Sequence, residues 1–226
     1  MLQRSENMVI FVLLSAFVIG YFLSIVISKI SLIISNTEDS ANNINKQLVD
    51  KLKARTIFTS RTIILILISG VLFLISFFKI GLNVVLIQAL ALNCILIVVS
   101  FVDIEHQIIP NKLIMTALVI GIVCLFINDI SLINALGGMS LGGGLLLLLA
   151  LVPGVLGGGD IKLMFVLGIF LGLEGVLVAI FLAFAIAAII SILLLLLKIK
   201  ERKDHIPFGP FLSIGTFIAF HFLNRF

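Results

Sequence analysis

Long apolar segments alternate with short polar connections along most of the chain. A helix of about 20 apolar residues can cross the hydrocarbon core of a bilayer, which is about 30 Å thick. By this criterion the pattern predicts eight membrane-spanning helices, at residues 8–34, 62–78, 82–102, 113–127, 130–152, 161–173, 175–197 and 208–223. The expected fold is therefore an all-α polytopic membrane protein, in which residues 1–226 form a single integral-membrane domain.

The composition supports a membrane protein. Of the 226 residues, 62% are hydrophobic and only 12% are charged, and the mean hydropathy is +1.35. The first apolar run has no small-residue cleavage site after a short apolar core, so we expect a retained span rather than a signal peptide. The two cysteines, Cys94 and Cys124, lie inside apolar runs, and no CxxC pair occurs. They are therefore expected to be packing residues, with no zinc site.

The distribution of basic residues predicts the orientation. Eight spans place both termini on one side of the membrane and the odd-numbered connections on the other. The odd connections and their flanks carry twelve of the fifteen Lys and Arg residues, and the opposite side carries only Arg4, Lys79 and Arg225. Because basic residues favour the cytoplasmic side, the odd connections are expected in the cytoplasm and both termini outside it.

One polar segment and one glycine-rich segment interrupt the pattern of apolar runs. Residues 35–61 form the one sizeable polar stretch, expected as a short cytoplasmic loop. Ile44, Leu48 and Leu52 have helical spacing, so this stretch is either an amphipathic helix or a solvated loop. Further along, Gly138 and Gly142 have the spacing that lets helix backbones approach closely.

Two aspartates at the edges of apolar segments are the candidate functional residues. Asp160 follows Gly157, Gly158 and Gly159, and Asp103 ends the third predicted span. A carboxylate at this depth costs several kcal/mol unless it is hydrated or paired. The glycines would permit unusual backbone conformations and close approach. The segment after Asp160 is short for a span, which favours a recessed, water-accessible site.

The predicted orientation puts both aspartates on the same side and at similar depth. Two adjacent carboxylates would share a proton. The charged one could then act as a base on water, and the neutral one could donate to a carbonyl oxygen, without a metal or cofactor. Alternatively, both are interfacial loop residues. Glu105 is a rival for the second acid on spacing alone, and His106 is expected as an interfacial hydrogen-bonding residue.

Residues 101–111 and 157–163 resemble the two aspartate motifs of the type IV prepilin peptidases, and residues 206–212 are similar to a signature near that family's last span. The resemblance implies a membrane aspartic peptidase with its core at residues 82–226. Such enzymes act at the cytoplasmic face of the bacterial membrane and remove a basic leader from prepilins or pseudopilins. The implied catalytic pair is Asp103 and Asp160. The supporting loop residues would be Gly157, Gly158, Gly159, Lys162, Pro110 and Asn111, and the partners would be the substrate and the lipid bilayer, with no nucleic acid.

The polar segment at residues 35–61 departs from the family pattern. Many members have two CxxC pairs in this loop and also methylate the new amino terminus, whereas this segment has no cysteine. No metal or cofactor is expected, and methylation stays open. Two rival hypotheses remain, another GxGD intramembrane protease of the presenilin or signal-peptide-peptidase type and a transporter that uses the carboxylates for protons or ions.

Overall fold

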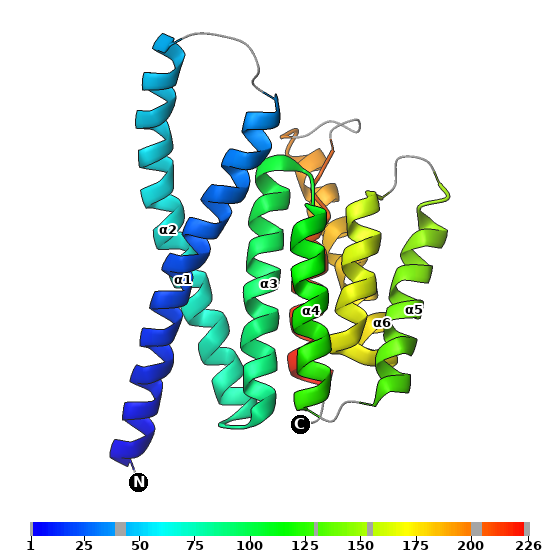
Figure 1. Cartoon of the computed structure of the whole chain (residues 1–226). Helices are drawn as coiled ribbons and strands as arrows, with labels where there is room; N and C mark the ends of the chain where they lie inside the picture. The colour runs from blue at the N-terminus through cyan, green and yellow to red at the C-terminus, as the bar shows by residue number, and fades with distance from the viewer. Residues whose placement is uncertain (1, 39–43, 129–130, 153–155, 200–204, 224–226) are drawn as a thin grey trace. The chain divides into compact units, whose positions relative to one another are not determined.

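The computed structural model describes residues 2–38, 44–128, 131–152, 156–199 and 205–223. All regular structure in these ranges is helical, as Figure 1 shows: α1 (Leu2–Glu38), α2 (Ile44–Ile80), α3 (Val84–His106), α4 (Asn111–Ile127), α5 (Leu132–Leu149), α6 (Gly158–Leu196) and α7 (Gly209–Leu223). Within the described residues, α1, α2, α3, α5 and α6 are long and apolar enough to span a membrane, and α4 and α7 are shorter apolar helices. The expected all-α membrane fold is confirmed, whereas the number of spans and the side of the termini stay predictions.

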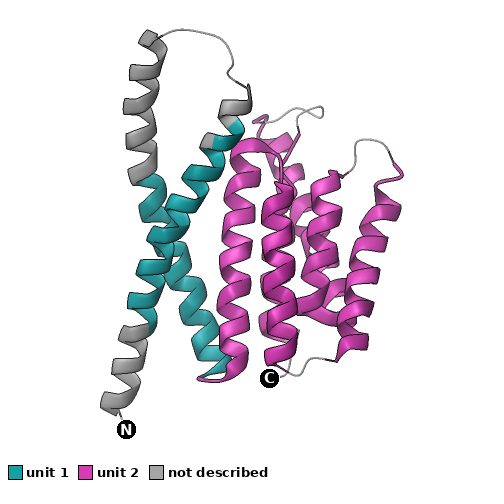
Figure 2. Ribbon diagram, viewed as in Figure 1, with its two compact units in different colours: residues 1–81 teal, residues 82–226 magenta. Residues whose placement is uncertain are grey.

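The chain divides into two compact units, Met1–Gly81 and Leu82–Phe226 (Figure 2). In the first unit α1 packs along α2 through small polar side chains. The hydroxyl groups of Ser24 and Thr62 are 2.7 Å apart and hydrogen-bonded, and Ser69 Oγ donates to the carbonyl oxygen of Ala16. Hydroxyl groups satisfied across two helices are typical of packing in an apolar environment.

The polar segment at residues 35–61 is helical on both sides of the gap at 39–43, which lies outside the described residues. α1 continues to Glu38 and α2 begins at Ile44. The helical alternative is therefore confirmed from Ile44 onward, although this helix is the first part of α2 and not a separate short element.

α6 is the central helix of the second unit. It packs against α4, α5 and α7, and α3 packs against α4 and α7. The side chains of Leu163, Met164 and Leu167 on α6 are completely buried. These contacts fix the start of α6 relative to the end of α3 and the start of α4 (Figure 1).

A break at Gly172 divides α6 into two helical parts. Gly172 has φ 66° and ψ −173°, a backbone conformation that favours glycine. The freed N–H of Leu173 donates to Asn134 Oδ1 of α5 at 3.0 Å. A straight helix of 39 residues would be about 58 Å long, almost twice the hydrocarbon thickness. The sequence predicted two segments that separate at residue 174, so the break is confirmed two residues earlier.

Glycines allow α5 and α6 to touch through their backbones. A Cβ added at Gly138 would lie 2.4 Å from the carbonyl oxygen of Gly168, and one at Gly142 would lie 3.0 Å from that of Met164. No residue with a side chain fits at the first position without displacing backbone. The close helix packing predicted from the Gly138/Gly142 spacing is confirmed.

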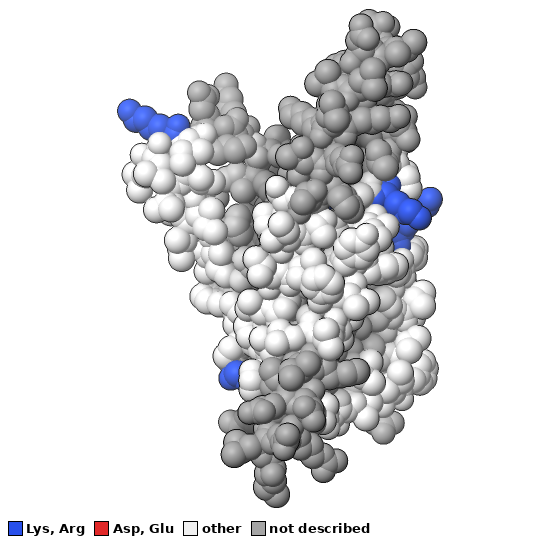
Figure 3. Space-filling view, turned by 90° about the vertical axis from the view of Figure 1, so that its left-hand side faces the viewer, with Lys and Arg blue, Asp and Glu red and all other residues white. Residues whose placement is uncertain are grey.

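Large apolar side chains cover much of the described surface. Ile133, Phe181 and Leu14 are 82%, 72% and 61% exposed. In the face shown in Figure 3, the few visible charged side chains are all Lys or Arg, and a wide uncharged region separates them. Exposed large apolar side chains at so many positions suit a lipid environment.

Candidate functional site

Asp103 and Asp160 line the same pocket, which has a volume of about 370 Å³. Asp103 lies in the last turn of α3, and Asp160 lies in the first turn of α6. The other lining residues are Gln107, Leu156, Gly157, His205, Ile206, Pro207 and Phe208. The structure thus brings together the two aspartates that the sequence singled out, and adds the segment just before α7 as a third wall.

Asp103 is 5% exposed and is held by a backbone donor. The N–H of Gly209, the first residue of α7, donates to Asp103 Oδ2 at 2.8 Å. N–H groups at the beginning of a helix have no partner within the helix, so they are well suited to bind a carboxylate. A Cβ at Gly209 would lie 2.7 Å from the same oxygen, so only glycine allows this contact without a shift.

Asp160 is 8% exposed and is less completely satisfied. Its Oδ2 atom accepts from the N–H of Gly157 at 3.3 Å, in the manner of a capping residue in the first turn of a helix. Its Oδ1 atom is buried and has no hydrogen-bond partner among the described residues. The carboxyl groups of Asp103 and Asp160 interact electrostatically. A buried oxygen without a partner is costly, so this atom is suited to receive a proton, a water molecule or a substrate group.

Gln107 and His205 form the polar part of the pocket wall that the sequence analysis missed. Gln107 ends α3 with φ 54°, and its Nε2 atom donates to the carbonyl oxygen of His205 at 3.5 Å. The signal for this wall was present in the sequence, because Gln107 lies in the first aspartate motif and residues 206–212 form the third matched stretch. The sequence analysis assigned no role at the site to Gln107 or to residues 206–212.

The three glycines before Asp160 differ in their surroundings. Gly157 lines the pocket and has φ −78° and ψ 145°, and none of the three has a positive φ. The expectation of an unusual backbone conformation is therefore wrong. The expectation of close approach is confirmed at Gly159, where an added Cβ would lie 3.1 Å from Cβ of Ile109. A Cβ at Gly158 would meet nothing within 4 Å.

The other supporting residues lie outside the aspartate pocket. Lys162 Nζ donates to Asn111 Oδ1 at 3.0 Å, and Pro110 is the residue that precedes α4 at its N-terminus. Residues two positions apart on a helix point about 200° apart. Lys162 therefore faces away from the side of α6 that carries Asp160, and it lines a second pocket together with Asn111.

Glu105 and His106 also lie outside the aspartate pocket. Glu105 Oε2 and His106 Nε2 are 3.8 Å apart. Glu105 is therefore not the carboxylate that faces Asp160. In the part of the chain that the structure describes, no group of three or more His, Cys, Asp or Glu residues could hold a metal ion.

Comparisons with known proteins bear on the stretch that contains this pocket. Residues 90–192 match the model of the type IV leader peptidase family. A prepilin leader peptidase/N-methyltransferase of Xanthomonas campestris is 29% identical over 165 residues, 70% of this chain and 58% of that protein. The Bacillus subtilis protein of the same name is 27% identical over 159 residues, 68% of this chain and 63% of that protein.

A third relative, the Pseudomonas aeruginosa prepilin leader peptidase/N-methyltransferase, is 33% identical over 131 residues, 55% of this chain and 45% of that protein. The matches thus cover 45% to 63% of the length of these relatives. No solved structure matches the chain. Residues 90–192, which contain both pocket aspartates, are therefore similar to the type IV leader peptidase family.

Proposed function

We propose that the chain is a membrane aspartic endopeptidase that removes the basic leader peptide from prepilins or pseudopilins. The names of the relatives and the family model that matches residues 90–192 support this activity. The observation that carries the proposal is that Asp103 and Asp160, both largely buried, line one pocket. Two carboxyl groups at one site are the machinery of aspartic proteases.

In the proposed reaction the two aspartates share one proton. The charged carboxylate takes a proton from a water molecule, whose oxygen attacks the scissile carbonyl carbon. The neutral carboxyl donates its proton to the carbonyl oxygen. When the tetrahedral intermediate collapses, the C–N bond breaks, the leaving amine receives a proton from the dyad, and one hydroxyl group of the intermediate returns its proton to the dyad. The N–H groups of Gly209 and Gly157 orient the two carboxyl groups for these transfers.

The proposed orientation places the pocket at the cytoplasmic face of the bacterial cell membrane. It is supported by the excess of Lys and Arg in the odd connections. With the two parts of α6 as separate spans, the chain would cross the membrane eight times and both termini would lie outside the cytoplasm. The basic leader of the substrate would stay in the cytoplasm, while its apolar segment would lie in the bilayer beside the chain.

The proposal covers the peptidase step. The relatives' names include methyltransferase activity, but the segment at residues 35–61 lacks the cysteine pairs found there in many family members. The same experiment can measure both activities, because a methyl group on the new amino terminus changes its mass.

The test is to incubate the purified full chain with a prepilin and to map the products by mass spectrometry. We expect one cut directly before the apolar segment. Asp103→Asn and Asp160→Asn should each lower the cleavage rate by about 10²–10⁴-fold, since each removes an acid–base group. Glu105→Gln is the matched control, because Glu105 lies outside the pocket, and it should retain cleavage. If both Asn variants reach the membrane and still cut the prepilin, the proposal is wrong.

A further inference from the structure

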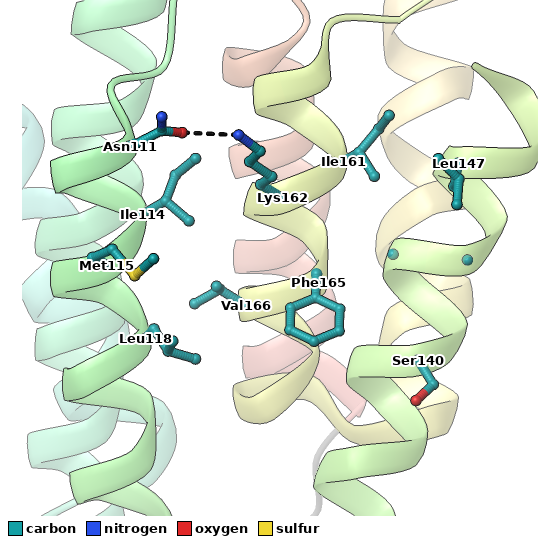
Figure 4. Close-up of a pocket in the computed structure, with 12 residues that line it drawn as sticks. Asn111, Ile114, Met115, Leu118, Ser140, Leu147, Ile161, Lys162, Phe165 and Val166 are labelled. Carbon is teal, nitrogen blue, oxygen red and sulfur yellow. Dashed lines mark hydrogen bonds between the residues drawn. The ribbon is translucent and has the colours of Figure 1, made fainter. Parts of the chain in front are cut away.

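A second cavity lies on the other side of the first turns of α6, between α4, α5 and α6 (Figure 4). Its volume is about 610 Å³, which exceeds that of the aspartate pocket. We call it the apolar groove, and its main side chains are Ile114, Met115, Leu118, Leu147, Phe165 and Val166. The α5 wall includes Gly143 and Gly144, which leave room for an occupant.

The apolar groove opens to the surface of the second unit. Met115, Leu147 and Phe165 are 62%, 57% and 41% exposed although they line the cavity. In a multi-pass membrane protein, such an opening between apolar helices faces lipid. The groove therefore needs an apolar occupant, because an empty apolar cavity loses the dispersion contacts of its walls.

One end of the apolar groove is polar and cationic. Figure 4 shows Lys162 and Asn111, joined by a hydrogen bond, above the apolar side chains of the cavity. Among the described residues, no carboxylate lies within ion-pair distance of Lys162. A cation at the mouth of an apolar cavity complements an anionic amphiphile: the charge meets the headgroup, and the cavity accepts the chain.

We propose that the apolar groove binds a phospholipid with an anionic headgroup. Its acyl chain lies against Met115, Leu118 and Phe165, and its phosphate lies at Lys162. The side chains of Ile122 and Phe126, which are 43% and 71% exposed, follow Leu118 at intervals of four residues on the same side of α4. They extend the apolar track for the remainder of the chain toward the other end of α4.

The charge at the groove mouth favours an anionic lipid over the substrate, because the basic leader of a prepilin would be repelled by Lys162. The lipid site does not depend on the proposed peptidase activity.

The first test measures lipid that remains on the full-length chain after purification in a mild detergent. Bound phospholipid is identified by mass spectrometry of the intact complex. We expect about one phospholipid per chain, enriched in anionic headgroups relative to the membrane. Gly144→Leu should lower retention at least threefold, because a Cβ at Gly144 meets nothing within 4 Å and the larger side chain enters the groove. Gly70→Leu, which also starts from open space but lies on α2, is the matched control and should retain the lipid.

The second arm tests the headgroup. Lys162→Gln should lower the preference for anionic over zwitterionic phospholipid about fivefold, the effect of one basic residue near a lipid surface. Lys112→Gln removes a neighbouring charge that does not line the groove, so it should keep the preference. Added inorganic phosphate should not displace the lipid, since the acyl chain supplies most of the contact.

A third arm reports directly on the acyl chain, and it remains informative if Gly144→Leu does not fold. The chain has no tryptophan, so Phe165→Trp introduces a single fluorophore into the groove. Phospholipids with brominated acyl chains should quench it more strongly when the headgroup is anionic. Phe181→Trp, at a 72% exposed position outside the groove, should show no such preference.

Three outcomes would overturn the proposal. The first is that the unaltered chain retains no more phospholipid than Gly144→Leu. The second is that Lys162→Gln keeps the headgroup preference. The third is that the groove variants leave lipid retention unchanged but raise the KM for a prepilin, which would assign the groove to the substrate helix instead.

Discussion

The first turns of α6 separate two cavities that differ in almost every respect. On one side, Asp160 meets Asp103 in a pocket of about 370 Å³, where backbone N–H groups hold both carboxyl groups. On the other side, Lys162 lies at the mouth of an apolar groove of about 610 Å³. The larger cavity lacks the two buried carboxylates. The proposed site for chemistry is therefore distinguished by buried ionisable groups and their donors, and not by cavity size.

The glycines around the two cavities differ in the same way. Gly209 leaves no room for a Cβ beside Asp103, whereas Gly144 in the groove has open space on the side where its Cβ would lie. The aspartate pocket should therefore be sensitive to one added methyl group, and the groove should tolerate it. Single Gly→Ala substitutions can test this difference.

Among the substitutions that test this difference, the largest expected effect is that of Gly209→Ala on cleavage. The added Cβ would lie 2.7 Å from Asp103 Oδ2, so the carboxyl group or the start of α7 must move. A displacement of about 1 Å at a catalytic group can cost about 100-fold in rate, and we expect a loss of this order in prepilin cleavage. Gly70→Ala, in open space on α2, is the control. A rate within twofold of the unaltered chain would show that the contact with Gly209 does not position Asp103.

A smaller effect is expected where α5 and α6 meet. Gly138→Ala would place a Cβ 2.4 Å from the carbonyl oxygen of Gly168, and overpacking of this kind costs about 1–3 kcal/mol in free energy of unfolding. Gly144→Ala, on the same helix but facing the groove, should instead stabilise by about 0.5–1 kcal/mol through helix propensity. Thermal unfolding in detergent measures the change in stability of both variants. Equal unfolding midpoints for Gly138→Ala and Gly144→Ala would contradict the close backbone packing of α5 against α6.

These contrasts also explain what could be predicted from the sequence. Asp103 and Asp160 are charges at the ends of apolar segments, so their position in one pocket could be inferred from the spacing of these segments. The break at Gly172 could be located within two residues, because a glycine and Glu174 interrupt an otherwise apolar run. Both features depend on local composition, which can be seen in the amino-acid sequence itself.

The contacts that complete the pocket could not be predicted in this way. Gly209 reaches Asp103 only because α7 packs against α3. Gly159 is small because Ile109 lies against it, and not because its backbone needs a positive φ. The apolar groove likewise depends on how α4, α5 and α6 pack together. All three features depend on the tertiary packing of distant segments, which cannot be inferred from the spacing of residues along the chain.

An effect of similar size to that of Gly138→Ala is expected at the break in α6. Asn134→Ala removes the acceptor for the N–H of Leu173, which lies 3.0 Å from Asn134 Oδ1. Leaving one backbone donor without a partner costs about 1–3 kcal/mol when water cannot replace it. We expect a lower thermal midpoint, and Asn134→Asp, which keeps an acceptor oxygen, should lose less. An unchanged midpoint for Asn134→Ala would show that water already satisfies this N–H.

The smallest effect is expected at the mouth of the groove. Asn111→Ala removes the hydrogen bond from Lys162, but both side chains are exposed, so water can replace the lost partner. Substitutions at exposed positions usually change the free energy of unfolding by less than about 0.5 kcal/mol, and the cleavage rate should stay within about twofold. Thermal unfolding and the prepilin assay measure both quantities on the same preparation. A tenfold loss of cleavage would mean that Lys162 and Asn111 act on the aspartate pocket across α6, and the two sides of this helix would then form one site.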